Sequence, residues 1–143
     1  MSGLRRRARE AALQILYFWE VGKAPPDDAI EQYFTLHRPD ETPEACQYAD
    51  RLVRGTIANL GHLDELIERH SRRWRLERLA VVDRLILRLA IWEFQSTDTP
   101  PAVVINEALE LARRFSTEDA VRFINGVLDA VIKRPDDPPV TTP

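Results

Sequence analysis

The chain has 143 residues, a mass of 16.5 kDa and a formal net charge of -3. Hydrophobic residues make up 44% of the sequence and charged residues 30%, which is typical of a globular protein and unlike a disordered chain. The single cysteine, Cys46, excludes an intrachain disulfide and a cysteine-based zinc site. No apolar run is long enough for a signal peptide or a membrane span, so we expect a cytoplasmic protein with no membrane contact.

The apolar residues recur at helical spacing between prolines, and no strand-like alternation is present. The sequence therefore predicts an all-α fold, a compact single-domain bundle of about seven helices. We expect this domain to cover residues 1–134, followed by a proline-rich, disordered tail over residues 135–143.

The first predicted helix covers residues 4–21, with an apolar stripe on one face and Gly22 as its stop. At about 100° per residue, the opposite face carries Arg6, Arg9, Leu13 and Tyr17. Arg5 and Arg7 flank the stripe. This helix therefore combines a core-facing side with an arginine-rich side.

The next helices are predicted from their start signals and their apolar faces. A short helix begins at residues 25–28, and Thr42 is a predicted cap for a helix through residues 45–57. Another short helix ends near His70. Residues 80–95 are apolar around almost the whole circumference, which predicts a central buried helix with a narrow polar strip of Arg84, Arg88 and Gln95.

Two more helices are predicted after the proline pair at residues 100–101. The first runs through residues 104–115, and the second is capped by residues 116–119 and buries apolar positions up to residue 131. Gly126 lies inside the second helix, where glycine costs about 1 kcal/mol relative to alanine. We therefore expect Gly126 to permit close packing against another helix.

No enzymatic motif is present in the sequence. A glycine-rich phosphate loop, an HExxH motif and a GxSxG motif are all missing, and the three histidines show no metal-ligand spacing. We expect no catalytic residue, no metal and no cofactor, and hence a protein that is not an enzyme.

Two basic segments stand out on this acidic chain, so any nucleic-acid binding must come from a local patch. The first holds Arg5, Arg6, Arg7 and Arg9, and the second, residues 69–88, holds seven arginines against Glu77 and Asp83. Arginine suits phosphate contacts and base stacking better than lysine does. A GC-rich or thermophilic source would explain the preference for arginine equally well.

An arginine-rich helix can align guanidinium groups with an RNA backbone, and Tyr17 and Phe123 are candidate stacking surfaces for bases. Phe123 lies beside Arg122 at the margin of the apolar stripe of its helix. The alternative is a solvated charged face with Phe123 at the core periphery. In that alternative, Arg84 and Arg88 pair with Glu77, Asp83 or Glu93.

Four sequence stretches resemble the NusB family of transcription antitermination factors, in the family's order and spacing. They are residues 5–17 (RRRAREAALQILY), 83–93 (DRLILRLAIWE), 104–112 (VINEALELA) and 123–129 (FINGVLD). The resemblance as a whole covers about residues 5–131, whereas residues 23–46 carry no such resemblance.

The resemblance implies a seven-helix protein that binds the boxA element of ribosomal-RNA transcripts, as single-stranded RNA, together with the ribosomal protein NusE. Other Nus factors and RNA polymerase would be indirect partners. The first helix, Tyr17, and the region of Asp119, Arg122 and Phe123 would face RNA, and the second basic segment adds Arg84 and Arg88 as candidates. Glu77 and Asp83 match positions at the NusE contact.

Two alternatives remain open at this point. The same fold occurs as the RNA-recognition domain of a ribosomal-RNA cytosine methyltransferase, but the sequence contains no cofactor-binding domain, which favours a separate factor. A protein-protein adaptor, such as a homodimer that buries the arginine face, would need no RNA.

Overall fold

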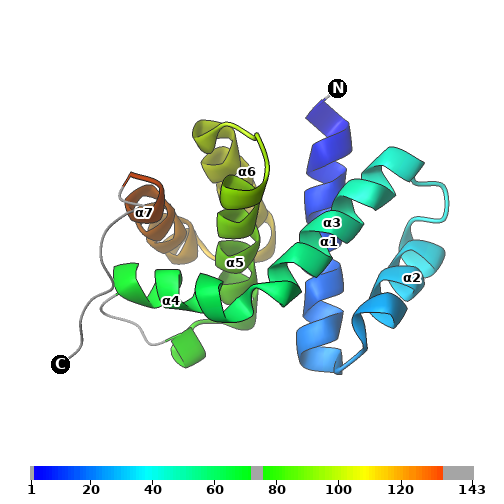
Figure 1. Cartoon of the computed structure of the whole chain (residues 1–143), viewed down its shortest axis with the longest axis horizontal. Coiled ribbons are helices and arrows are strands. Elements are labelled where there is room, and N and C mark those ends of the chain that lie inside the picture. Colours follow the sequence, from blue (N-terminus) through cyan, green and yellow to red (C-terminus); the bar gives the residue numbers. More distant parts are fainter. Residues whose placement is uncertain (1, 72–75, 134–143) are drawn as a thin grey trace. The chain divides into compact units, whose positions relative to one another are not determined.

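The computed structural model describes residues 2–71 and 76–133, and these residues form seven α-helices and one short 3-10 helix (Figure 1). The predicted all-α class is therefore confirmed. The predicted tail, residues 135–143, lies outside the described residues. None of the described helices has the length and hydropathy to cross a membrane. The elements are α1 (Ser2–Gly22), α2 (Pro26–His37), α3 (Pro43–Ala58), α4 (Leu60–His70), η1 (Leu76–Arg78), α5 (Val81–Ser96), α6 (Pro101–Phe115) and α7 (Glu118–Lys133).

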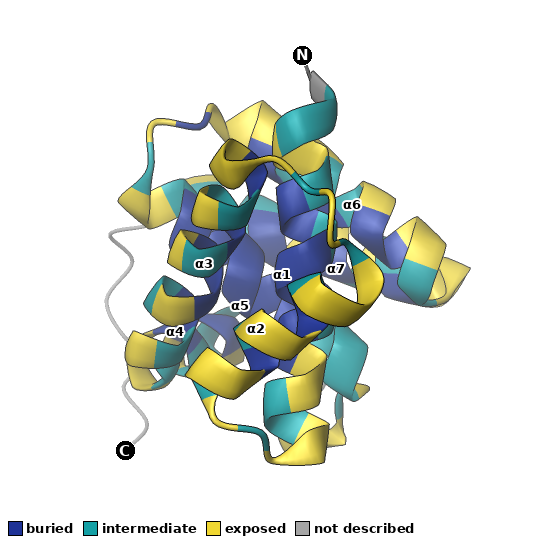
Figure 2. Cartoon of the chain, turned by 90° about the vertical axis from the view of Figure 1, so that its right-hand side faces the viewer, coloured by how far each residue is buried: buried dark blue, intermediate teal, exposed yellow. Residues whose placement is uncertain are grey.

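The chain divides into two compact units, which we describe separately. The N-terminal unit, Met1–Ala58, contains α1 to α3, and α1 packs against both other helices. The C-terminal unit, Asn59–Pro143, contains α4 to α7, and α5 packs against α4, α6 and α7. Buried faces alternate with exposed ones along the helices (Figure 2). The single domain over residues 1–134 stays a prediction.

The predicted helix starts are confirmed where a threonine side chain caps the helix. The Oγ1 atom of Thr42 accepts a hydrogen bond from the N–H of Ala45 at 3.2 Å, at the start of α3. The same bond joins Thr117 Oγ1 to the N–H of Ala120 at 3.1 Å, at the start of α7. Each bond satisfies one of the N–H groups that a helix start leaves without a helical partner.

The end of α1 differs in detail from the prediction. Gly22 is the last helical residue, and the left-handed conformation is taken by the next residue, Lys23, with φ of 59°. The stop is therefore a lysine in a conformation that glycine adopts more readily. Gly22 itself does not supply the left-handed turn that the sequence suggested.

The prediction of a central buried helix is confirmed for α5 in the C-terminal unit. Every residue from 85 to 93 is buried, including Arg88 and Glu93. Burial around the whole circumference follows from the contacts of α5 with three other helices.

The expected close packing at Gly126 is wrong. This residue is exposed on α7, and a Cβ atom built there would meet no described atom within 4 Å. Packing within the described chain therefore gives no reason for a glycine at this position, while its cost in backbone entropy remains.

We predict that Gly126→Ala raises the free energy of unfolding by about 0.5–1 kcal/mol, because alanine loses less backbone freedom in a helix. Urea denaturation monitored by circular dichroism at 222 nm would measure the change. A loss of stability would show that Gly126 is packed closely after all.

Candidate nucleic-acid interface

The four N-terminal arginines of α1 lie in different environments. Arg5 and Arg6 are exposed, Arg7 is half-buried, and Arg9 is only 5% exposed. The prediction that Arg9 projects into solvent is therefore wrong. Because α1 packs against both α2 and α3, its buried sector is wider than one stripe and includes Leu13 as well.

Arg7 is held by a carboxylate that is almost buried. Its Nε atom lies 3.1 Å from both oxygens of Glu41, whose side chain is 6% exposed. Arg38 donates to Glu41 at 3.4 Å and to Glu10 at 3.3 Å, and the N–H of Thr42 donates to Glu41 at 2.9 Å. We call Arg7, Glu10, Arg38 and Glu41 the Glu41 cluster. Its two cations and two anions balance, so Arg7 belongs to the fold as much as to the surface.

The Glu41 cluster also fixes the ionisation of its central carboxylate. Burial alone would raise the pKa of Glu41, but hydrogen bonds from Arg7 and Thr42 and the charges of Arg7 and Arg38 outweigh it. The net result is a pKa below the ordinary value of 4.5. A carboxyl group whose pKa is lowered on folding stabilises the folded state above its ordinary pKa, and this contribution disappears as the pH falls through the lowered value.

We predict that Glu41→Gln lowers the free energy of unfolding at pH 7 by about 1.5–3 kcal/mol, the range for hydrogen bonds to charged groups. The parent loses the stability that the charged Glu41 contributes as this group is protonated in acid. The difference in free energy of unfolding between parent and variant should therefore become smaller as the pH falls below 4.5. Urea midpoints between pH 7 and the acid limit of folding would measure it. Glu31→Gln, an exposed substitution on α2, is the control; an equal deficit at every pH would contradict the prediction.

Arg5 lies against an aromatic ring. Its Cζ atom lies 4.8 Å from the ring centroid of Tyr48, which is half-buried on α3. The sequence did not single out Tyr48, Glu41 or Arg38, because their roles depend on contacts between α1 and residues distant along the chain. In the sequence, only their aromatic or charged residue types indicated that these three residues could contact α1.

The predicted exposure of Tyr17 is confirmed, since this residue is 42% exposed on α1. Phe18, which no sequence pattern indicated, is equally exposed and stacks on His37 of α2 with an interplanar angle of 11°. The second half of α1 therefore presents two neighbouring aromatic rings.

The arginines described in the second basic segment are less exposed than the charge of the segment suggested. The guanidinium of Arg88 forms two hydrogen bonds with Asp64 of α4, at 2.7 and 3.0 Å, and its side chain is 8% exposed. A buried arginine in such a pair cannot reach a phosphate without breaking the pair, so its burial argues against the predicted contact of Arg88 with RNA. Arg84 is half-buried and donates to the carbonyl of Leu76 at 3.4 Å. Three of the seven arginines lie in residues 72–75, outside the described residues.

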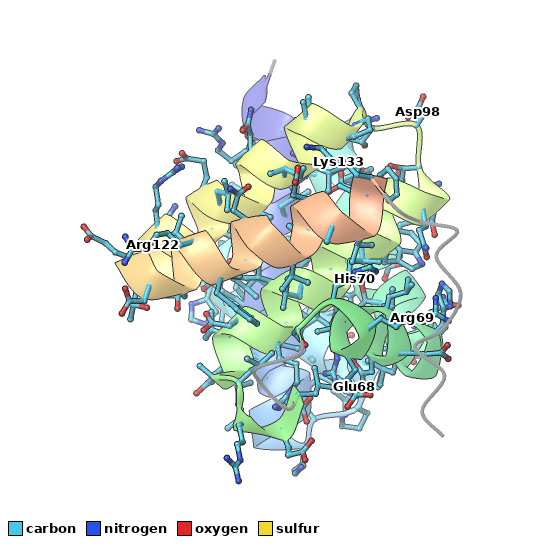
Figure 3. The ribbon with its side chains drawn as sticks, turned by 90° about the vertical axis from the view of Figure 1, so that its left-hand side faces the viewer. Glu68, Arg69, His70, Asp98, Arg122 and Lys133 are labelled. Carbon is cyan, nitrogen blue, oxygen red and sulfur yellow. The ribbon has the colours of Figure 1, made fainter. Side chains whose placement is uncertain are left out.

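The α7 candidates lie at the start of that helix. The side chains of Asp119 and Arg122 are 90% and 75% exposed and form an ion pair of 2.5 Å. Arg122 projects outward from the ribbon (Figure 3). Phe123 is half-exposed, which is compatible with a stacking surface and with the core periphery.

The two candidate partner residues also differ in environment. Glu77 is exposed in η1, whereas Asp83 is half-buried in the first turn of α5. The Oγ atom of Ser116 donates to Asp83 at 2.6 Å, which ties the start of α5 to the end of α6. Asp83 therefore has a structural contact that a drastic substitution would remove.

Metal-binding side chains do not gather on the part of the chain that the structure describes. No three histidine, cysteine or acidic side chains lie close enough there to hold a metal ion. Burial and the charge of Glu41 raise the pKa of the Cys46 thiol, which disfavours the nucleophilic thiolate.

These features define the class: an all-α protein with an arginine-bearing helix, exposed aromatic rings and no assembled metal site among the described residues. The NusB family profile matches residues 6–133. The chain belongs to the NusB family.

The sequences of individual relatives align with this chain over almost its full length. The transcription antitermination protein NusB of Solibacter usitatus is 51% identical over 134 residues, which cover 94% of this chain and 92% of that protein. The protein of the same name from Symbiobacterium thermophilum is 45% identical and covers 90% of this chain and 89% of its own length.

Two solved structures are similar throughout. NusB of T. maritima superposes with a TM-score of 0.81 at 38% identity and covers 90% of each chain. A chain from the complex of antitermination factors NusB and NusE with double-stranded RNA has a TM-score of 0.83 at 29% identity, covering 93% of this chain and 98% of that one.

Proposed function

We propose that this chain is a transcription antitermination factor that binds boxA RNA of ribosomal-RNA transcripts together with the ribosomal protein NusE. Its relatives carry the name of transcription antitermination protein, and a structural neighbour is described as NusB with NusE and RNA. The observation that carries the proposal is the exposure of Arg5, Arg6 and Tyr17 on one helix.

The spacing along α1 suits a single RNA strand. Arg6 and Tyr17 are eleven residues apart, which is about three turns, so they share a face and lie about 16 Å apart along the axis. In this proposal Arg5 and Arg6 contact phosphates and Tyr17 stacks on an unpaired base. Both kinds of contact would follow one strand along the helix.

The C-terminal unit supplies the other contacts of the proposal. Asp119, Arg122 and Phe123 form a second RNA-facing set at the start of α7, where Phe123 is the stacking surface. Glu77 and Asp83 meet NusE, and the complex reaches other Nus factors and RNA polymerase through these partners. The protein acts by binding alone and needs no cofactor.

Fluorescence anisotropy with a labelled, single-stranded boxA-like RNA tests this function directly. We expect binding that becomes tighter when NusE is added, and weaker binding of a scrambled RNA and of a duplex of the same sequence. Equal affinity for the boxA-like and scrambled strands, with and without NusE, would contradict the proposed function.

We predict that Arg5→Ala combined with Arg6→Ala reduces the slope of log affinity against log salt by about 1.4, since each phosphate contact to a single strand contributes about 0.7. Arg7 is left unchanged because Glu41 holds it. Anisotropy titrations at several salt concentrations would measure the slope.

The matched control removes two exposed arginines of other helices, namely Arg54, bound to Asp27 and Asp50, and Arg113, bound to Glu110. Arg54→Ala with Arg113→Ala changes the net charge by the same amount. An equal fall in slope for both double variants would show a general charge effect and no site on α1.

We predict that Asp83→Asn weakens NusE binding roughly fivefold, which corresponds to about 1 kcal/mol, the upper end of the range for an ion pair at a protein surface. Asparagine removes the charge and keeps an oxygen that accepts the hydrogen bond from Ser116. Calorimetric titration with NusE would measure the affinity.

Ser116→Ala is the control, because it removes the same hydrogen bond and keeps the carboxylate. It should lower the melting temperature and leave NusE affinity at the parent level. If Ser116→Ala weakens NusE binding as much as Asp83→Asn does, Asp83 acts only through the fold.

A further inference from the structure

The second half of α1 carries an aromatic ring that packs on α2 and still faces solvent. Phe18 is 43% exposed, and its ring lies beside the imidazole of His37, the last residue of α2, with centroids 6.2 Å apart and planes 11° from parallel. Near-parallel rings at this separation are offset, so each ring covers only part of the other. No further ring of the described chain contacts Phe18. Phe18 therefore keeps open ring surface in a plane that His37 helps to orient.

The turn after α1 places a cation close to this ring. The N–H of Ala24 donates to the carbonyl of Phe18 at 3.4 Å, so the chain folds back over the last turn of the helix. Lys23 lies within this turn, is exposed, and has a φ of 59°, which a glycine would adopt with less strain. Among the described residues, no acid pairs with its ammonium group. A strained backbone at an exposed residue points to a role for the side chain.

An open aromatic ring beside a cation without an acidic partner suits a nucleotide. A base stacks on an aromatic ring without regard to its sequence, and an ammonium group binds phosphate as a point charge. Tyr17, the stacking residue of the proposed function, directly precedes Phe18, and the two side chains point about 100° apart on the helix. The splayed bases of a single RNA strand can meet rings that point in different directions.

We infer that Phe18 and Lys23 form a second nucleotide-binding position, in which Phe18 stacks on a base and Lys23 contacts a phosphate of the same RNA strand. This inference rests on the proposed function and extends the path of the strand from Tyr17 to the C-terminal end of α1, beside α2 (Figure 1). The contact with His37 restricts the Phe18 side chain before RNA arrives, which lowers the entropy lost on binding.

Substitutions of Phe18 test the stacking contact by anisotropy with the single-stranded boxA-like RNA. Phe18→Ala should weaken binding roughly fivefold or more, the lower end of the range for one stacked base, and leave the salt slope unchanged. Phe18→Tyr keeps an aromatic ring and should bind like the parent. Val21→Ala is the control, since Val21 is 48% exposed near the same end of α1 but has no ring for a base. It should leave RNA affinity unchanged.

The phosphate contact is tested by Lys23→Gly. This change should reduce the slope of log affinity against log salt by about 0.7, the value for one phosphate of a single strand. The urea midpoint should not fall, because glycine adopts the positive φ with less strain. The only other lysine, Lys133, pairs with Asp129 at the end of α7, so Lys133→Ala removes the same charge and should leave the slope unchanged.

Each outcome decides the inference, provided that the variants keep a native circular dichroism spectrum. Weaker binding by Phe18→Ala alone, together with the smaller slope for Lys23→Gly alone, supports the second position. Phe18→Ala that binds like the parent, or Lys23→Gly with the parent slope, overturns it while the proposed function stands. Equal weakening by Val21→Ala also overturns it, since a general apolar contact such as a protein surface would then explain the effect. If the parent itself does not bind the RNA, the proposed function fails and this inference fails with it.

Discussion

The N-terminal unit depends on the hydrogen bonds that the nearly buried carboxylate of Glu41 accepts. It accepts hydrogen bonds from Arg7 on α1 and from Arg38 just after α2, and it lies just before α3, so one side chain connects all three helices. A buried charge is tolerated only where partners replace its hydration. This requirement commits Arg7 to the fold and leaves Arg5 and Arg6 as the exposed arginines at the start of α1.

The same rule operates in the C-terminal unit, where α5 is buried on all sides. The burial of the Arg88 charge is compensated because its guanidinium donates two hydrogen bonds to Asp64, which lies on α4. Asp83 takes its hydrogen bond from Ser116 and so connects α5 to α6. A count of arginines therefore overstates the positive charge that is available to a ligand, because part of that charge stabilises helix contacts.

The sequence predicted the helices well because their signals are local. A threonine followed by a proline or an acid predicts a cap within three residues, and both caps, Thr42 and Thr117, form the expected bonds. The apolar circumference of α5 likewise predicts burial without knowledge of the partners. The face of α1 was predicted less well, since contacts on two sides bury Arg9.

The site residues that the sequence missed depend on pairing between distant segments. Arg7 and Glu41 are 34 residues apart, and Arg88 and Asp64 are 24 apart, so no local pattern joins them. Tyr48 reaches Arg5 in the same way, from α3 to α1. Gly126 is the reverse case: its cost in a helix suggested packing, yet the described chain leaves open space there.

In the proposed function, RNA contacts Arg5, Arg6 and Tyr17, which are exposed on α1, and leaves the pair of Arg88 and Asp64 intact. Titration of the isotope-labelled protein with a single-stranded boxA-like RNA, followed by NMR of the arginine Nε–H and backbone signals, tests it most directly. We predict the largest shifts at Arg5, Arg6 and the amides around Tyr17, with the Nε–H of Arg88 unchanged because Asp64 holds it. Largest shifts at Arg88, or an α1 that does not respond to RNA, would contradict the account.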